Sequence, residues 1–578
     1  MKEDRIKFIM KLVPLLMAVI SYTFIHTILY NKFYSFIPSM LFIVLVVLFY
    51  NNDYNNKVMK KETLVLSALF ALLISYGELL KPNFYSNINT FTEFFKIEHI
   101  MRFIAYFNML YLFFNNTLPK LYKWKLKDGN YQNINYVLIF SVSFSIILLC
   151  WFPYCLRFFP GLVTNDSMDS ITLIVHHLKG INNHHPVFFT LFAYLPIMIG
   201  KVKFGSISTG VALYTLIQMF TMASIFASSI IFLYKRNVNK YAIFTVLLCY
   251  ALVPVYAMHS VIMWKDVLFG GLFLLLTLQM IRMAELYNKN ELTLKKLISF
   301  IIIAILCALF RNNAIFMLMI VFVICLFIFK KKRKVVSLAF GIVIITYFLI
   351  TGPGYKLFGV RQTETTEYIS IPIQQVARIV HKGVPLTLEE EKLINKVMPI
   401  ETLKRRYRPE IVDTIKWYKD YDAKAIEKNK FKYFKLWLGL CLRHPQIALE
   451  ANAASTLGYW YPNIIYWYNP LHITNEKYDV YVTSKAGEKT TDIIDKTLNS
   501  DSTIFNIEWN IALWLYIALV FGVISYKKKK WVGVVPYLPL FGLWFTLIIA
   551  TPVYAEFRYI FGAFTAMPIL IIYPYLKK

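Results

Sequence analysis

The sequence contains few charged residues for its length. Charged residues make up 16% of its 578 residues, whereas 58% are hydrophobic. A soluble domain cannot bury that much apolar surface, so the composition excludes an ordinary soluble globular protein. Cysteine is also scarce: the six cysteines are scattered along the chain and include no CxxC pair. Neither a disulfide framework nor a zinc site is therefore expected.

Acidic residues are the scarcer of the two charged classes. The chain has 33 Asp and Glu against 62 Lys and Arg, a formal net charge of +29. In a soluble protein this excess would suggest a nucleic-acid partner. Here the basic residues cluster just outside apolar runs, as at residues 330–334 and 527–530, and form no stripe interleaved with aromatics. The positive-inside bias of membrane proteins explains this pattern better, and we expect no nucleic-acid partner.

Long apolar runs recur along the chain, and each is long enough to cross a bilayer as a helix. The sequence therefore predicts an all-α, multi-pass protein of the cell membrane, surrounded by membrane lipids, with about fourteen transmembrane helices. The N-terminal run is too long for a cleaved signal peptide, and we interpret it as the first of these helices. The predicted spans are residues 7–30, 34–50, 63–80, 98–115, 133–155, 207–234, 240–258, 267–286, 294–310, 313–329, 335–352, 508–526, 532–550 and 558–576.

Basic linkers between the spans set their orientation. All of these linkers lie on the cytoplasmic side if the apolar residues 187–203 do not cross the membrane. We therefore expect this segment to lie in the outer interface or to re-enter, which Pro196 near its middle would allow. The linkers are residues 57–61, 120–127, 235–240, 330–334 and 527–530.

The same orientation divides the chain into four regions. An extracytoplasmic segment interrupts the spans and is predicted to be mostly helical. Its Tyr- and Trp-rich patch, residues 458–470, could stack on sugars or lie at the membrane surface, and the second interpretation is favoured because aromatic belts are common there. The regions are residues 1–130 (N-terminal transmembrane helices), 131–352 (a transmembrane core with a polar outer loop at 156–206), 353–507 (the extracytoplasmic domain) and 508–578 (C-terminal transmembrane helices).

The outer loop at 156–206 concentrates titratable side chains. Asp166 and Asp169 are spaced i, i+3, so on a helical turn both carboxylates could bind a metal ion or act as a base and its orienting partner. Alternatively, Asn165 or Asp166 caps the helix that follows. His184 and His185 form a pair whose spacing matches no HExxH-type metal signature, and such a pair is often structural.

Further charges are predicted at the same outer face. Lys265 and Asp266 are expected to end an apolar helix, where they could be an ordinary interfacial pair. Arg311 lies between two apolar spans and needs a phosphate, a carboxylate or lipid headgroups as its partner. Arg558 needs a partner of the same kind, and Glu556 could simply pair with it. The rest of the chain has almost no charge inside its apolar runs, so this coincidence predicts a functional site.

The arrangement of these residues resembles the GT-C class of membrane glycosyltransferases, which share an acidic first outer loop followed by interfacial helices. In this resemblance Asp166 and Asp169 match the acidic motif, His185 with the two residues after it matches the His-Pro stretch, and Asp266 matches an acid at the outer end of a later helix. The chain is most similar to the bacterial, largely uncharacterised DUF6020-type membrane proteins. The resembling pieces, spread over residues 159–565, are FPGLVTNDSMDS, NNHHPV, MWKDVLF, FRNNAIF, SIPIQQVARIV, YRPEIVDTIKW, GYWYP and EFRYIF.

This resemblance implies an inverting transferase that moves a sugar from a polyprenyl-phosphate donor to a glycan or lipid acceptor at the cell surface. Asp166 would be the base, with Asp169 as its partner or, with Asp166, as a ligand of a divalent cation such as Mg²⁺ or Mn²⁺. Arg311 and Arg558 would bind the donor phosphate. The remaining residues, which would orient the acceptor, are Asp266, His184, His185 and Lys265.

Two alternatives share the lipid-linked substrate. A flippase or transporter of a lipid-linked oligosaccharide should have charges in the middle of its spans and broken helices in paired halves. A polymerase or ligase of surface polysaccharide would use the same donor class and differ in accepting a long glycan.

Overall fold

The computed structural model is helical throughout its described part, which forms no β-strand and only four isolated bridges. This confirms the predicted all-α class. Residues 7–30 and 34–50, the first two expected spans, lie outside the described residues. The structure describes residues 59–131, 134–363, 365–464, 477–498 and 507–577.

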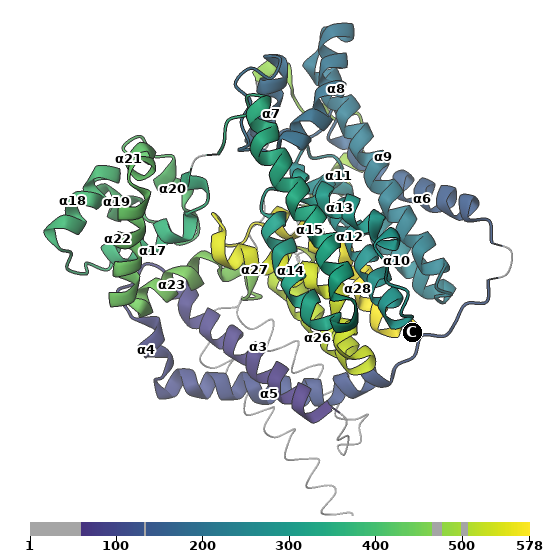
Figure 1. Ribbon diagram of the computed structural model, residues 1–578, viewed down its shortest axis with the longest axis horizontal. Helices are drawn as coiled ribbons and strands as arrows, with labels where there is room; N and C mark the ends of the chain where they lie inside the picture. The colour runs from purple at the N-terminus through teal and green to yellow at the C-terminus, as the bar shows by residue number, and fades with distance from the viewer. Residues whose placement is uncertain (1–58, 132–133, 364, 465–476, 499–506, 578) are drawn as a thin grey trace, which may run out of the picture.

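The long helices form two groups (Figure 1). The first is a pair, α3 (Lys60–Leu80) and α5 (Ile97–Lys123), connected through the short α4 (Thr90–Phe94), and its apolar core extends onto α26 (Ile511–Lys529). The second is a larger bundle with α12 (Lys265–Asn288) among its most buried helices. The other helices of this bundle are α6 (Tyr136–Arg157), α9 (Ile207–Tyr234), α10 (Lys240–Leu252), α11 (Pro254–Ser260), α13 (Ile298–Phe310), α14 (Ala314–Ile328), α15 (Arg333–Leu349), α27 (Leu538–Ala550) and α28 (Phe561–Ile572).

Local sequence signals fix where several of these helices begin and end. Asn135 and Asn239 precede α6 and α10, and each side-chain oxygen accepts hydrogen bonds from backbone N–H groups of the first turn. Asn510 caps α26 in the same way. Pro254 cannot continue α10, because it lacks a backbone N–H, so α11 begins there at a bend of 51°.

Eight described helical segments are long and apolar enough to cross a membrane, or nine if the bent pair α10–α11 is one span. They are consistent with a membrane protein, but the expected count of fourteen is not confirmed. The expected span at 98–115 is covered by α5, which does not meet the criterion, and α13 and α14 are only 13 and 15 residues long. α26 and α27 form one apolar segment because the 3₁₀ helix η11 (Lys530–Tyr537) joins them.

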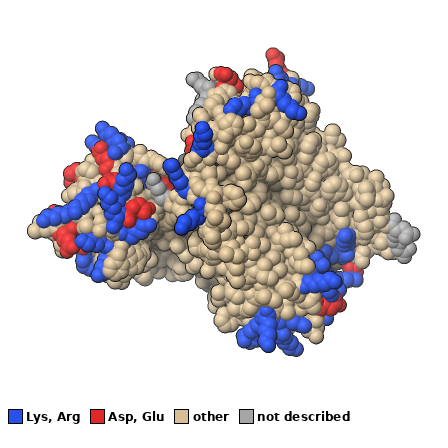
Figure 2. All heavy atoms as spheres, turned by 45° about the horizontal axis from the view of Figure 1, so that its top comes forward, with Lys and Arg blue, Asp and Glu red and all other residues tan. Residues whose placement is uncertain are grey.

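The described parts of the five basic linkers lie at one end of the two helix groups, and Phe329, just before residues 330–334, packs against Tyr287 at the end of α12. Lys527 forms an ion pair with Glu62 at 2.9 Å, which joins the end of α26 to the start of α3. The Tyr575 hydroxyl donates to the backbone of Leu121, and Gly129 N–H donates to Asn237 O. Lys and Arg side chains accordingly gather at the lower end of the bundle in Figure 2, below a broad uncharged surface. We refer to this end as the basic end.

α7 (Asn165–Val175) and α8 (Val187–Phe204) lie at the other end of the bundle. α8 folds back along the first part of α9: Gly200 and Gly210 are in close contact, and the ring of Phe192 packs edge-on against Tyr214. α9 continues beyond Tyr214 for roughly five more turns. α8 therefore accompanies only part of α9. Since α8 also passes the length and hydropathy test for a span, its interfacial placement stays a prediction.

The segment expected as an extracytoplasmic domain contains a helical lobe, residues 365–455, at the left of Figure 1. The lobe has its own apolar core, in which α17 packs against α19, α22 and α23. At the start of α18, Thr387 and Glu390 form a reciprocal capping box. The helices of the lobe are α17 (Ser370–His381), α18 (Leu388–Val397), α19 (Ile400–Arg406), α20 (Asp413–Lys416), α21 (Ala423–Lys428), α22 (Lys430–Arg443) and α23 (Pro445–Ser455).

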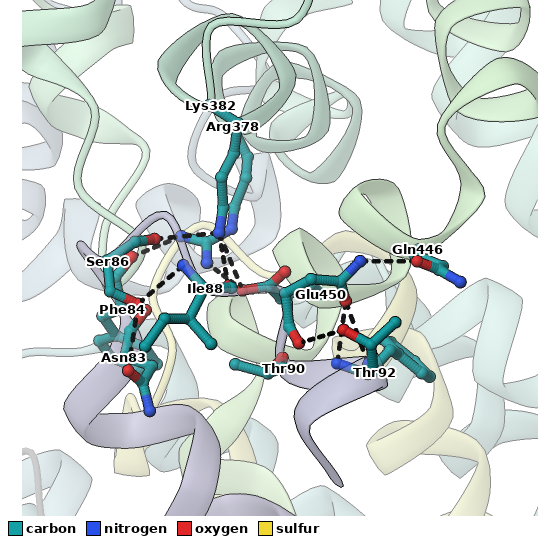
Figure 3. Close-up of polar contacts among 12 residues, drawn as sticks. Asn83, Phe84, Ser86, Ile88, Thr90, Thr92, Arg378, Lys382, Gln446 and Glu450 are labelled. Atoms are coloured by element: carbon teal, nitrogen blue, oxygen red, sulfur yellow. Dashed lines mark hydrogen bonds and ion pairs between the residues drawn. The ribbon is translucent and has the colours of Figure 1, made fainter. Parts of the chain in front are cut away.

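A buried ionic joint attaches the lobe to the loop after α3 (Figure 3). Arg378 of α17 donates hydrogen bonds to Glu450 of α23 and to the backbone oxygen of Phe84, and both charged side chains are fully buried. Lys382 lies 3.6 Å from the same carboxylate and donates to Ser86 O at 2.9 Å. A buried charge is tolerated only with its partners in place, so this joint fixes the position of the lobe.

The aromatic patch at 458–470 is part of the core where the structure describes it. Tyr459, Trp460 and Tyr461 are buried, and Trp460 stacks on Tyr76 of α3. The Tyr516 hydroxyl of α26 donates to Trp460 O at 2.7 Å. The expectation that this patch lies at the membrane surface is therefore wrong for residues 458–464, which fill the space between the two helix groups; residues 465–470 lie outside the described residues.

The contact between α8 and α9 predicts a difference between two glycine variants. A Cβ at Gly210 would lie 2.8 Å from Ile197 Cα, whereas a Cβ at Gly341 in α15 would meet nothing within 4 Å. Both replacements by alanine favour a helix by about 1 kcal/mol. We expect Gly210→Ala to lower the melting temperature of the detergent-solubilised protein and Gly341→Ala to leave it unchanged or raise it. Equal melting temperatures would contradict the close packing.

Candidate functional site

Five segments meet at the end of the bundle opposite the basic end. They are the first two turns of α7, the loop before α8, the start of α12, the turn between α13 and α14, and the 3₁₀ helix η12 (Phe557–Ile560) before α28. All eight residues singled out in the sequence lie in these segments, although the first and the last are 392 residues apart. Their convergence confirms that they share one face of the molecule.

α7 is held in place by contacts with the chain just before α12. Leu162 N–H donates to Val261 O and Met263 N–H donates to Leu162 O, both at 2.9 Å. The indole N–H of Trp264 donates to the Thr164 hydroxyl at 2.8 Å. Thr164 is the N-cap residue, so Asp166 is the second residue of the helix. The alternative in which Asn165 or Asp166 caps this helix is therefore wrong.

Asp166 forms the accessible centre of the site. Its carboxylate lies 2.7 Å from the Arg558 guanidinium and 3.8 Å from the Lys265 ammonium, and 37% of its side chain is exposed. Burial alone would raise the pKa of Asp166, but the positive charges of Arg558 and Lys265 outweigh it and hold the pKa well below its usual range. Asp166 is therefore ionised at neutral pH.

His185 connects the two acids of α7 through Lys265. The Lys265 ammonium lies 3.2 Å from His185 Nδ1, and because an ammonium can only donate, Nδ1 accepts and Nε2 carries the proton. Nε2 lies 3.7 Å from the carboxylate of Asp169, whose side chain is 71% exposed. Burial and the nearby charge of Lys265 lower the pKa of His185, which is therefore neutral at neutral pH.

Asp266 and Arg311 form a second, buried layer beneath Asp166. Their side chains are hydrogen-bonded to each other and are 1% and 8% exposed. Arg311 also donates from Nε to Asn313 at 2.8 Å and packs over the rings of Phe269 and Tyr559. Arg311 thus has a carboxylate partner in the protein. Arg558 also has carboxylate partners, Asp166 at 2.7 Å and Glu556 at 3.7 Å, and its side chain is 16% exposed.

Several site residues were not singled out by sequence reasoning. Tyr559 packs against both Arg311 and Arg558 at 5.2 Å. From the lobe, Trp417 is exposed and its ring lies 6.5 Å from that of His184. Asp413 lies one helical turn before Trp417, and burial, with smaller contributions from the charges of Glu367 and Asp166, raises its pKa against the effect of Lys416. The motif YRPEIVDTIKW, which contains both lobe residues, was noted only as part of a resemblance.

The buried aromatic segment positions Arg558. The hydroxyl of Tyr459 donates to Val553 O and accepts from Glu556 N–H at 3.2 Å. Gly458 N–H donates to Tyr554 O at 2.8 Å, and a Cβ at Gly458 would lie 2.2 Å from Ala555 Cβ. Glycine is required at this point because the two backbones approach so closely.

The donor set fits an anion better than a divalent cation. Asp166 is already held by two cationic side chains, and Asp169 faces a histidine. In the described part of the chain, no three His, Cys, Asp or Glu residues come together in a way that could hold a metal ion. A reaction at this site can therefore be explained with protein side chains alone.

Comparison with known families gives one match. A model described as "Family of unknown function (DUF6020)" matches residues 174–577. The matched region contains six of the eight candidate residues and begins after Asp166 and Asp169. The chain matches no curated protein and no solved structure, so no comparison connects it to the GT-C class.

The two layers predict unequal effects of the same substitution. Asp266→Asn would leave the Arg311 charge buried without its partner, which costs about 3–5 kcal/mol. Asp169→Asn removes an exposed carboxylate, worth about 0–1 kcal/mol. Denaturation of the two variants in one detergent should therefore show a large loss of stability only for Asp266→Asn. Similar losses in both would contradict the assignment of Asp266 to a buried ion pair.

Proposed function

For this chain, which belongs to the DUF6020 family of unknown function, we propose the activity of a membrane glycosyltransferase. It moves a sugar from a polyprenyl-phosphate donor to a hydroxyl of a glycan or lipid acceptor. The observation that carries the proposal is an accessible carboxylate, Asp166, held between Arg558 and Lys265 at the end of an apolar helix bundle. Such a site offers a base for a hydroxyl and cations for a phosphate at the depth where a lipid-linked donor presents its headgroup.

The side chains supply the groups that the reaction requires. The acceptor oxygen attacks the anomeric carbon of the donor sugar, and the bond from that carbon to the phosphate oxygen breaks with inversion. The proton of the acceptor hydroxyl passes to Asp166. The bonding electrons leave with the polyprenyl phosphate, whose added negative charge Arg558 and Lys265 stabilise. The buried pair of Asp266 and Arg311 lies beneath Asp166, Arg558 and Lys265 and holds them in position.

Binding of the donor also prepares the base. Without donor, the pKa of Asp166 is too low for efficient proton uptake at neutral pH. A donor phosphate competes for the guanidinium of Arg558, whose planar fork suits phosphate oxygens. Once Arg558 turns to the phosphate, Asp166 keeps its partial burial and loses its nearest counter-charge, so its pKa rises. The acid thus becomes a better base when the donor is in place.

An apolar pocket beside Arg558 supports a lipid-linked donor. The pocket is a small apolar recess between α26, α27 and α28. Phe557 and Ile560, at the two ends of η12, contribute to its wall on either side of Arg558 and Tyr559. A donor whose phosphate binds Arg558 could pass its lipid around η12 into this pocket, and we include this path in the proposal. The other lining residues are Ile511, Trp514, Leu515, Leu540, Trp544, Ala563, Phe564 and Met567.

One observation favours a lipid-linked oligosaccharide flippase as a second candidate. α10 and α11 form a bent pair that can be a broken span, and transporters use broken helices at their binding sites. The charged residues of the site nevertheless lie at one end of the bundle. Movement of a fluorescent lipid-linked sugar across proteoliposomes by the Asp166→Asn variant would favour this second function.

The role of Asp166 can be tested by its amide variant. With purified donor and acceptor, Asp166→Asn should lower kcat by about 10²- to 10⁴-fold, because a general base contributes this much. The matched control is Asp492→Asn, which removes an exposed carboxylate of α24 (Glu488–Leu498) that pairs with Lys496 on the same helix. Both variants should remain in the membrane with unchanged melting temperatures. Full activity of Asp166→Asn would remove this residue from the chemistry.

The pocket predicts a dependence on the length of the lipid. Ala563→Leu adds three carbons to the pocket wall and should raise KM for a long-chain donor by about fourfold for each methylene displaced. A donor that carries a methyl group in place of the lipid has nothing to put in the pocket, so its KM should be affected far less in the same variant. An equal change in KM for both donors would show that the lipid does not occupy this pocket.

A further inference from the structure

Helix α22 of the lobe has two opposite apolar faces. Leu436 and Leu440 point into the core of the lobe and are buried. A second set of apolar side chains follows the spacing i, i+3, i+7, i+11, which places them in one stripe on the other side of the helix. These four are exposed, from 37% for Leu438 to 71% for Leu442. The exposed stripe is Phe431, Phe434, Leu438 and Leu442.

Positive charge borders this stripe. α22 contains Lys430, Lys432, Lys435 and Arg443 and no acidic residue. Lys435 lies over the ring of Phe431 at 4.7 Å, so its ammonium stays next to the stripe. In Figure 2 the visible surface of the lobe carries many Lys and Arg side chains with Asp and Glu side chains between them. An apolar stripe of Phe and Leu bordered by lysines is typical of a helix that lies in a membrane interface.

The position of α22 brings it to the expected membrane surface. α22 leads directly into α23, whose Gln446 accepts a hydrogen bond from Asn89 at 2.6 Å. Asn89 caps α4, which connects α3 to α5 at the end of these helices that lies away from Lys60 and the basic end. Phe95, just after α4, is 72% exposed. The exposed stripe of α22 thus lies near the ends of α3 and α5 that we expect to leave the hydrocarbon region of the bilayer.

We propose that α22 is an interfacial membrane anchor of the lobe. Its four exposed apolar side chains insert between the lipid headgroups, and its lysines bind anionic headgroups such as phosphatidylglycerol. The exposed apolar stripe would be buried in the lipid, and the lobe is attached to membrane helices. Lys430 and Arg443 pair with glutamates, whereas Lys432 and Lys435 add positive charge beside the stripe that matches an anionic lipid surface. The anchor holds the lobe at a fixed height, so Asp413 and Trp417 remain above Asp166 and His184.

Photo-crosslinking of the full chain in lipid nanodiscs tests this anchor. The discs contain a phospholipid with a photoreactive group near its headgroup, in phosphatidylglycerol or in phosphatidylcholine. Cleavage after glutamate isolates α22 in one peptide, residues 428–450, and the exposed Leu388 of α18 in another, residues 368–389. We expect label in the first peptide and not in the second, and about fivefold or more label in phosphatidylglycerol than in phosphatidylcholine.

A charge variant provides the matched comparison. Replacing Lys430, Lys432 and Lys435 by glutamine should lower the label in phosphatidylglycerol to the level seen in phosphatidylcholine, with an unchanged melting temperature, because all three side chains are exposed. A peptide 428–450 without label in both lipids, while the spanning helices are labelled, would overturn the proposal. Protection of that peptide by a bound protein, again without lipid label, would assign the stripe to a protein partner and overturn it as well.

Discussion

The site depends on one buried ion pair, between Asp266 at the start of α12 and Arg311 between α13 and α14. In an apolar bundle neither charge can be stable there alone, because desolvation of an unpaired charge costs several kcal/mol. The pair therefore fixes the positions of two helix ends relative to each other. Tyr559 packs over Arg311, and this contact brings η12 and Arg558 to the same point. The contact between Asp166 and Arg558 therefore depends on the pairing of Asp266 with Arg311 beneath it.

The location of the site could be predicted from the sequence. Which acidic side chain pairs with which arginine could not. In an apolar chain the few charges inside or beside spans are expected to lie at helix ends and to face one another. Asp166, Asp266, Arg311 and Arg558 met that expectation. Which arginine pairs with which acid depends on the order of the helices around the bundle, and hydropathy does not contain this order. Arg311 was expected to bind phosphate, and in the structure it has a carboxylate partner instead.

The fold, like the site, could be predicted from the sequence only in part. Runs of apolar residues located the described helices, and Asn or Pro at their ends explained several boundaries. The aromatic segment at 458–464 was misjudged because Tyr and Trp suit a membrane interface and a core equally well by composition. Its hydrogen bonds to Val553 and Glu556 arise from contacts between distant segments, and these contacts make it the support of Arg558. Likewise, α22 and its exposed stripe could be recognised only after its buried face was known.

The contact between Asp166 and Arg558 also bears on how the protein is assembled. The two residues are 392 positions apart, and Arg558 directly precedes the last helix of the bundle. During synthesis, α7 and α12 are complete long before η12 emerges from the ribosome. Until then the Lys265 ammonium, 3.8 Å away, is near Asp166, but the closer contact with Arg558 at 2.7 Å is missing. Insertion of the final helix therefore supplies the last cationic side chain of the site, so a chain interrupted before η12 would be left with a membrane bundle but without a finished site.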